Sequence, residues 1–317
     1  MTPRISRRAA LAGAGVSALV GAGTARSARA AEPAGARASR RAPLDLATPL
    51  GNVTAYLKMR ASIETQDVYF WFTGRLDLAV PGEPVRPIIE VASLILRRTE
   101  RVADLAWNVI DWEASMYRHL DGGAWLEADE PIVNPHTGRK VRPMPYREGP
   151  VRFRFTDQEP RIIGSRDVMP NTGKPFSYPW KVVGGDLYMV KSSYIRAPNW
   201  LQPVDWPLES SGKDVVVAAH SSLKSRFADV QDPRVASAPA DFAYTATSGW
   251  LPWMQMGATP GHVVWAESGK KLFSLDEAPP DQVARLRQVH PAWFARPEPW
   301  PEFTNMYLQY KEKYAVR

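Results

Sequence analysis

The chain has 317 residues, of which 44% are hydrophobic, and it carries a formal net charge of +7. It contains no cysteine, which excludes disulfides, thiolate metal ligands, cysteine-ligated iron–sulfur clusters and cysteine nucleophiles. Residues 1–30 hold five arginines and no acidic residue, and residues 31–43 hold three arginines and one glutamate. These two segments account for the whole excess charge, so residues 44–317 are close to neutral and we expect no nucleic-acid partner.

The N-terminal segment 1–30 has the composition of an export signal. It begins with the basic Ser6-Arg7-Arg8, continues with the uncharged run 9–25 and ends with Ala28-Arg29-Ala30, which supplies the small residues that a signal peptidase requires. The adjacent arginines indicate the twin-arginine translocase. Residues 31–43 are rich in Ala, Pro, Gly and Ser and predict a flexible linker. We therefore expect a periplasmic or secreted protein without a transmembrane segment.

Residues 44–317 are predicted to form a single β-rich domain. Apolar residues recur there with period two or in short runs bounded by Pro, Gly, Asn and Asp. The predicted strands are Asp67–Leu76, Glu90–Arg98, Ala103–Asp111, Val151–Thr156, Arg161–Val168, Asp186–Ile195, Asp214–Ser221, Phe242–Trp250 and His262–Glu267. We expect a mostly β fold, a single antiparallel lipocalin-like barrel, with a two-sheet β-sandwich as the alternative. Short peripheral helices are predicted over Asn52–Arg60 and Asp281–Arg287.

The segment Asp111–His119 gathers two carboxylates, a phenol and an imidazole within nine positions. In a strand, the odd-numbered residues share one face. If that face lines the interior, its side chains form an acid–base set, since proton transfer requires groups within hydrogen-bond reach. If it faces water, they are ordinary surface residues. The candidate catalytic residues are Asp111, Glu113, Tyr117 and His119.

The densest aromatic motif is Trp250-Leu251-Pro252-Trp253-Met254-Gln255-Met256-Gly257. Trp and Met offer large polarisable surfaces, so the motif predicts either the wall of an apolar pocket or a hydrophobic plug that closes one end of the barrel. In the first case the candidate substrate-binding residues are Arg60, Trp250, Trp253, Met254 and Met256.

Several common site motifs are missing from the sequence. The five histidines show no HxH or HExxH spacing, so no metal site is predicted from a local motif. There is no GxSxG elbow, no GxGxxG fingerprint and no GxxxxGK[ST] loop. The sequence therefore predicts no metal and no cofactor, and it lacks the usual signatures of α/β-hydrolases and nucleotide-binding enzymes.

Four motifs together resemble a known family. They are Tyr56–Ser62, the turn Asn134-Pro-x-Thr-Gly, Phe176–Trp180, and Trp250-Leu-Pro-Trp-Met-x-Met-Gly-x-x-Pro-Gly. They are similar to the family catalogued as domain of unknown function 1838, over residues 45–314, and Asn305 before Tyr307–Tyr314 fits the family's tail. The resemblance implies one domain and an export signal. It implies no established reaction and supplies no catalytic residue.

These observations lead to three functional hypotheses. The first is an exported, cofactor-independent enzyme, a lyase, isomerase or hydrolase, that acts on a hydrophobic small molecule. The alternative is a lipocalin-like carrier that binds such a ligand without catalysis, and the third hypothesis is a scaffold protein without a pocket. A catalyst needs ionisable side chains that touch one another in the cavity, whereas a carrier needs one or two orienting polar groups.

Overall fold

The computed structural model describes residues 44–163 and 173–315. The predicted signal 1–30 and linker 31–43 lie outside the described residues. Within the described part of the chain, ten strands form one antiparallel sheet in the order β7-β6-β3-β2-β1-β12-β11-β10-β9-β8. These strands are β1 (Gln66–Ala79), β2 (Arg86–Ala103), β3 (Ala106–Arg118), β6 (Tyr146–Phe155), β7 (Arg161–Ile162), β8 (Trp180–Val183), β9 (Asp186–Pro198), β10 (Asp214–Arg226), β11 (Asp241–Ser248) and β12 (His262–Leu272).

Short elements complete the described structure. Two short strands, β4 (Ile132–Val133) and β5 (Lys140–Val141), form a separate ribbon. The helices are α1 (Pro49–Arg60), α2 (Phe227–Gln231), η2 (Pro252–Met254), η3 (Leu275–Glu277), α3 (Pro280–Val289), α4 (Pro291–Ala295) and α5 (Met306–Tyr314). Among the described residues, no helix combines the length and apolarity needed to cross a lipid bilayer.

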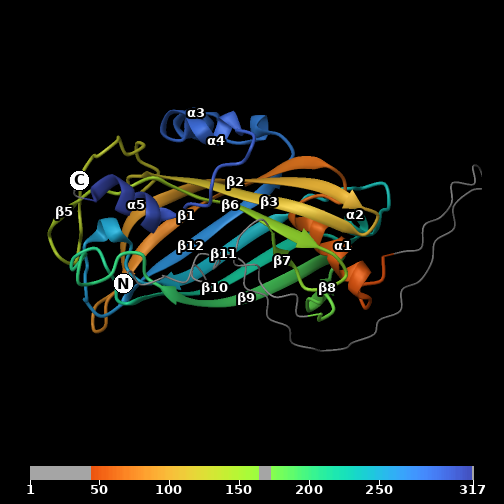
Figure 1. Cartoon of the computed structure of the whole chain (residues 1–317), viewed down its shortest axis with the longest axis horizontal. Coiled ribbons are helices and arrows are strands. Elements are labelled where there is room, and N and C mark those ends of the chain that lie inside the picture. Colours follow the sequence, from red (N-terminus) through yellow and green to blue (C-terminus); the bar gives the residue numbers. More distant parts are fainter. Residues whose placement is uncertain (1–43, 164–172, 316–317) are drawn as a thin grey trace, which may run out of the picture.

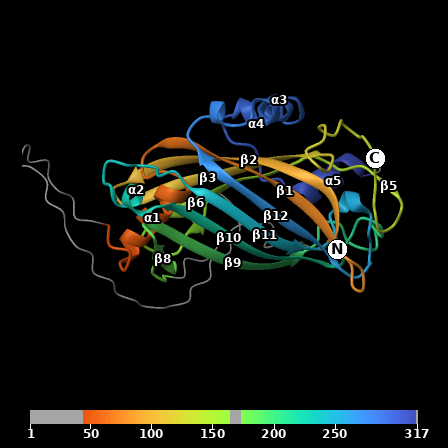
Figure 2. The same cartoon turned by 180° about the vertical axis from the view of Figure 1, so that it is seen from behind.

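The sheet consists of two meanders that are joined by its first and last long strands. Strands β1, β2, β3, β6 and β7 form one wing and β8 to β12 the other, and β1 pairs with β12 from Tyr69↔Leu272 to Ala79↔His262. The wings curl toward each other, because inward side chains of both meet in one core: Phe70 and Val109 from the first wing contact the same cluster as Met189 and Leu223 from the second. Figures 1 and 2 show this curvature from opposite sides.

The prediction of a mostly β fold with a large antiparallel sheet and few short helices is confirmed. Closure of the barrel is not, because among residues 44–163 and 173–315 the hydrogen-bonded ladder ends at β7 and β8 without pairing these two edges. Each edge strand is short and pairs with a single neighbour, β7 with β6 and β8 with β9.

The two ends of the curled sheet are filled with apolar side chains. At one end α1 lies inside rather than at the periphery, with Val53, Leu57 and Met59 fully buried. This helix begins after Thr48, whose Oγ1 accepts a hydrogen bond from the Gly51 amide, an N-cap that fixes the start of the helix. At the other end the tryptophan motif around η2 packs with α5 in a second core cluster.

The helices α3 and α4 cover the outer face of β1, β2 and β3 (Figure 1). Trp293 of α4 is buried there, and its Nε1 donates a hydrogen bond of 2.9 Å to the carbonyl of Trp112. The helix predicted over Asp281–Arg287 is thus present, slightly longer, as α3. Because α3 and α4 hold the even-numbered side chains of β3 on the outside, the odd-numbered side chains of that strand are directed inward.

Candidate functional site

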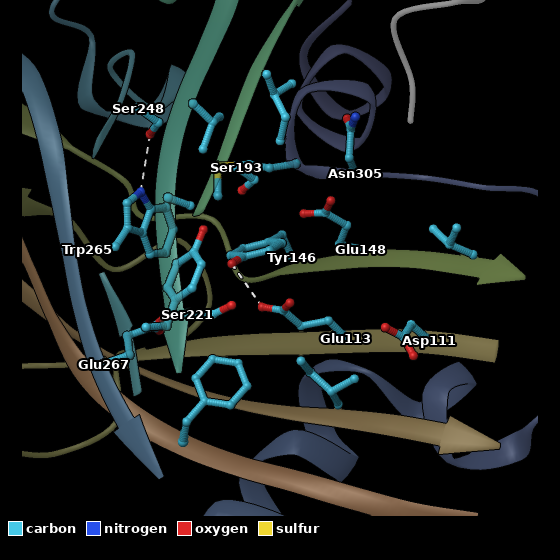
Figure 3. Close-up of a pocket in the computed structure, with 18 of the residues that line it drawn as sticks. Asp111, Glu113, Tyr146, Glu148, Ser193, Ser221, Ser248, Trp265, Glu267 and Asn305 are labelled. Atoms are coloured by element: carbon cyan, nitrogen blue, oxygen red, sulfur yellow. Dashed lines mark hydrogen bonds between the residues drawn. The ribbon is translucent and has the colours of Figure 1, made fainter. Parts of the chain in front are cut away.

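A cavity of about 290 Å³ lies inside the curled sheet. Its volume is close to the lower limit of typical small-molecule sites. Residues of both wings line it, together with Arg60 at the end of α1 and Asn305, Met306 and Tyr307 at the start of α5. Its apolar walls are formed by Phe72, Ile95, Val151, Phe153, Ile195, Val215, Val217, Phe242, Leu251 and Trp265. Figure 3 shows that polar side chains of several strands converge in this space.

The strand β3 supplies two acidic side chains to the cavity. Asp111 and Glu113 line it, while Trp112 and Ala114 between and after them pack outward in the cluster under α3 and α4. The odd-numbered face of the segment 111–117 is therefore the interior face, the first of the two orientations considered from the sequence.

A bulge in β6 adds a third acidic side chain. The register between β3 and β6 shifts between Asp111 and Glu113, so that Glu113 lies opposite Glu148 while Asp111 lies opposite Val151. Gly149 makes the bulge with a φ of +100°, and a Cβ at this position would lie 2.6 Å from the carbonyl oxygen of Asp111. Only glycine adopts this shape without strain. The bulge lets Glu148 and Val151 both face the cavity.

The C-terminal segment is attached to the same bulge. The amide of Gly149 donates to the carbonyl of Thr304 at 3.0 Å, and the amide of Thr304 donates to the carbonyl of Gly149 at 3.1 Å. Asn305, the next residue, caps α5 by accepting a hydrogen bond from the Leu308 amide at 2.9 Å. This pairing brings the start of α5 beside Glu148 as part of the cavity wall.

We name Glu113, Glu148 and Glu267 the carboxyl cluster. Glu113 Oε1 accepts hydrogen bonds from Ser115 Oγ at 2.8 Å and from Tyr146 OH at 3.2 Å (Figure 3). Burial raises the pKa of Glu113, against the effect of these two donors and of the Arg97 charge. Figure 3 shows that Glu148 and Tyr146 point into the same space as Glu113.

The other two carboxyls of the cluster have fewer partners. Burial, and then the charge of Glu113, raises the pKa of Glu148 to about 7. Glu267 of β12 is 8% exposed, and its Oε1 has no hydrogen-bond partner among the described residues. Burial, with the charge of Glu113, raises the pKa of Glu267 well above its ordinary value. Glu148 is therefore able to hold and release a proton near neutral pH.

We name Arg60, Arg97 and Lys191 the basic cluster. Asp111 joins the two arginines: Arg60 Nη2 donates to its Oδ2, and Arg97 Nε lies 3.3 Å from its Oδ1. Burial, and then the neighbouring Arg60 charge, lowers the pKa of Arg97 to about 10, and burial also lowers the pKa of Lys191. With a pKa of about 10, Arg97 stays charged at neutral pH.

Tyr56 of α1 belongs to the surroundings of the basic cluster. Its hydroxyl accepts a hydrogen bond of 2.9 Å from Arg60 Nη1. Burial opposes ionisation of this phenol, but the charges of Arg60, Lys191 and Arg97 together lower its pKa. The lowered pKa of this phenol thus follows from the positive charges that surround it.

Two of the four candidate catalytic residues do not line the cavity. Tyr117 is buried beyond it, with its ring 5.6 Å from that of Trp253. The side chain of His119 is 44% exposed, and its Nε2 lies 3.0 Å from Glu130 Oε1 outside the cavity. The structure thus brings Asp111 and Glu113 together with Arg60, and it places His119 elsewhere.

The tryptophan motif forms a plug. Trp250, Trp253, Met254 and Met256 are buried in the core cluster at the α5 end, and Leu251 is the member of the motif that reaches the cavity wall. The turn predicted at Asn134 closes against this plug, since Asn134 Nδ2 donates a hydrogen bond of 3.0 Å to the carbonyl of Met254. This arrangement is the plug alternative considered from the sequence.

Four charged cavity residues were missed by the sequence analysis: Arg97, Glu148, Lys191 and Glu267. For Arg97, Lys191 and Glu267 the sequence does carry a signal, because each charged residue stands in phase with apolar residues along its strand. Lys191 follows Leu187 and Met189, and Glu267 follows Val263 and Trp265 on the inward face. A charge placed in the apolar phase of an alternating strand is costly to bury and therefore indicates a functional position.

The comparisons with known proteins concern the whole sheet. A family model matches residues 65–313, and its description is protein of unknown function (DUF1838). The chain belongs to the DUF1838 family. The matched region contains all ten strands of the sheet, whereas Arg60 and the rest of α1 precede it. A comparison with curated proteins found no match.

Membership in the DUF1838 family confirms the resemblance seen in the sequence motifs. It assigns no reaction, so functional inference depends on the cavity itself. Among the residues that the structure describes, no group of three or more His, Asp or Glu side chains is placed to hold a metal ion.

Proposed function

We propose that this protein is an exported acid–base enzyme that acts without a cofactor on a small molecule with a hydrophobic part. The reaction class is that of a lyase, an isomerase or a hydrolase. One observation carries the proposal: Glu113 and Glu148 lie opposite each other on β3 and β6, both face the cavity, and burial raises the pKa of Glu148 to about 7. Two carboxyls with different surroundings can act as base and acid at neutral pH.

Glu113 is suited to act as the base. Two hydroxyl donors, Ser115 and Tyr146, stabilise its ionised form, and Ser115 Oγ in turn lies 2.7 Å from Ser93 Oγ, so the hydroxyls form a buried chain behind the carboxylate. The carboxylate would accept a proton from a carbon of the substrate or from an attacking water. Its fixed hydrogen bonds keep it oriented in an environment with little water.

Glu148 is suited to act as the acid. No hydroxyl or amide of the described residues donates to its carboxyl, and its pKa of about 7 leaves it about half protonated at pH 7 and mostly protonated below that pH. It would give its proton to the oxygen of a carbonyl or of a leaving group. Return of one proton from Glu113 to solvent and uptake of another by Glu148 would complete the cycle.

Contacts between ionisable groups favour catalysis over simple binding. The cavity contains the ion pairs of Asp111 with Arg60 and Arg97 and the hydrogen bond between Glu113 and Tyr146. A carrier needs no such coupled groups, and burying them is costly. A lipocalin-like carrier remains the second candidate because the walls of the cavity are largely apolar. The volume of the cavity disfavours a scaffold protein without a site.

We further propose that the curled sheet encloses its ligand as a lipocalin-like barrel does. The curled sheet would shield the ligand from solvent while α1 and the tryptophan plug fill its two ends. A two-sheet sandwich would instead fill the space between its sheets with side chains. Export by the twin-arginine translocase to the periplasm or the exterior completes the proposal, based on Arg7 and Arg8 in the leader.

Turnover of a defined panel tests the proposal. The full-length protein would be incubated with small amphipathic acids, esters, lactones and enoyl compounds, with product formation followed by mass spectrometry and deuterium exchange at carbon by NMR. We expect turnover of at least one class and a loss of about 100-fold or more in both Glu113→Gln and Glu148→Gln. Glu302→Gln, at an exposed position, is the matched control.

Two results would oppose the proposal. Unchanged turnover in both glutamine variants would remove these residues from the chemistry. Binding of panel members without turnover or exchange by the wild-type protein would establish the carrier instead.

A further inference from the structure

The basic cluster lines one side of the cavity and has more positive charge than its own partners neutralise. Three cations, Arg60, Arg97 and Lys191, line this side. Among the described residues, Asp111 is the one carboxylate in ion-pair contact with them. Two positive charges in excess therefore face a cavity with apolar walls, where water neutralises them poorly.

The arginines keep N–H groups available for an acceptor. Arg97 is 4% exposed, and its Nε lies 3.3 Å from Asp111 Oδ1 without making a hydrogen bond to it. The Nε of Arg60 also lacks a hydrogen-bond acceptor within the described part of the chain. A guanidinium does not lose its proton at physiological pH, so burial cannot be relieved by neutralisation. Buried donors of this kind are normally satisfied, by the protein or by a ligand.

Lys191 is the free member of the basic cluster. No hydrogen bond or ion pair is recorded for its ammonium among residues 44–163 and 173–315, although it lies in β9 on the same face as the buried Leu187 and Met189. An apolar residue would suit this position better for stability alone. The positions of Lys191 and the two arginines, on three separate elements around one space, are those of a site for an anion.

We propose that the basic cluster binds the anionic head group of an amphipathic substrate, a carboxylate or a phosphate, while the apolar walls hold its hydrophobic part. This inference rests on the proposed function and names its substrate class. A carboxylate at Glu113 repels an anion, whereas the basic cluster attracts one, so the cavity favours one orientation of the substrate. The head group then lies at Arg97 and Lys191, and the uncharged reacting atoms lie toward Glu113 and Glu148.

Binding of paired probes by calorimetry tests the inference apart from turnover. The probes are 3-phenylpropanoate, its neutral counterpart 3-phenylpropanamide, and 2-phenylethyl phosphate, each with the full-length protein. We expect the wild-type protein to bind at least one anionic probe about tenfold or more tightly than the amide. Preference between the carboxylate and the phosphate identifies the head group.

The variant Lys191→Met keeps the length of the side chain and removes the charge without leaving a partner unpaired. We expect it to lose about tenfold or more in affinity for the preferred anion and to bind the amide as before. The control is Lys181→Met, which removes the same charge from an exposed position on β8. Glu148→Gln is expected to bind the anion at least as tightly as the wild type while losing turnover.

These outcomes separate the two proposals. Equal binding of the anions and the amide, equal loss of both in Lys191→Met, or no binding of any anionic probe at about 1 mM overturns the anion site. Anion binding that depends on Lys191, combined with turnover that is unaffected in Glu113→Gln and Glu148→Gln, supports the site and refutes the acid–base enzyme.

Discussion

The two charged ends of the cavity are built by the same strand alternation but are stabilised in different ways. At the basic end the guanidinium charges are permanent, so a carboxylate, Asp111, has to lie between Arg60 and Arg97. At the acidic end a carboxyl group need not be charged, because burial raises the pKa of Glu148 and favours its protonated form. The basic end is therefore suited to hold a ligand, and the acidic end to exchange protons.

The largest effect is expected from neutralising Asp111. Asp111→Asn leaves two arginines facing each other without a counter-charge, and the side chains of Asp111 and Arg60 are only 18% and 16% exposed. Removing one partner of such a buried group should reduce the free energy of unfolding by about 3 kcal/mol. Urea denaturation at pH 7 measures the change.

The matched control for Asp111→Asn is Asp281→Asn. Asp281 is also paired with an arginine, Arg118, but its side chain is 56% exposed, so less than about 1 kcal/mol is expected. Similar small losses in both variants would show that the basic cluster is solvated rather than buried, and the proposed anion site would lose its main argument.

The acidic end should make stability depend on pH. Burial raises the pKa of Glu148 from an ordinary value of 4.5 to about 7. Below pH 4.5 the carboxyl is protonated in both the folded and the unfolded chain; between pH 4.5 and 7 only the unfolded chain releases the proton. The free energy of unfolding therefore falls as the pH rises through this window, by up to about 3 kcal/mol.

Glu148→Gln removes this contribution. Urea denaturation at intervals from pH 4.5 to 8 should give a flatter profile for the variant than for the wild type, with the variant the more stable of the two at pH 8. Glu302→Gln, at an exposed position, should keep the wild-type slope. A wild-type profile that rises over the same window would contradict the raised pKa.

The sequence allowed part of this site to be predicted. Alternation along β3 was sufficient to place Asp111 and Glu113 on one face, because a strand without a bulge keeps its phase. Which of its faces is the interior depended on α3 and α4, which are distant in sequence and bury Trp112. For the same reason the alternation alone did not show that His119, beyond the end of the strand, leaves the cavity.

Glu148 illustrates why the remainder was missed. The run from Val151 to Phe155 alternates strictly, and counting back in the same phase turns Glu148 outward. The bulge at Gly149 reverses the phase and turns it inward. The curvature that brings Lys191 and Arg97 into the wall of one cavity likewise depends on pairing between β1 and β12, the first and last strands, and no local pattern encodes that pairing.

A test of this bulge probes how the acidic end is held in place. Gly149→Ala introduces a side chain at a φ of +100° and against the carbonyl of Asp111, with an expected loss of about 2 kcal/mol in the free energy of unfolding. The control Gly82→Ala has a similar positive φ of +82° but no atom within 4 Å of the new Cβ. A smaller loss is expected there, and equal losses would mean that the contact with Asp111 has no role.

The smallest expected effect concerns the hydroxyl donors that distinguish Glu113 from Glu148. Tyr146→Phe removes the hydrogen bond of 3.2 Å to Glu113 Oε1, which favours the ionised carboxylate. The pKa of Glu113 should rise further, and stability at pH 7 should fall by about 1 kcal/mol. NMR titration of the 13C-labelled glutamate carboxyl resonances measures the first effect and urea denaturation the second.

Tyr244→Phe is the control, since Tyr244 lines the same cavity and makes no hydrogen bond to Glu113 among the described residues. If the pKa of Glu113 is unchanged in Tyr146→Phe, or rises equally in both variants, then burial alone sets the proton affinity of the acidic end and the assignment of Glu113 as base and Glu148 as acid loses its physical basis.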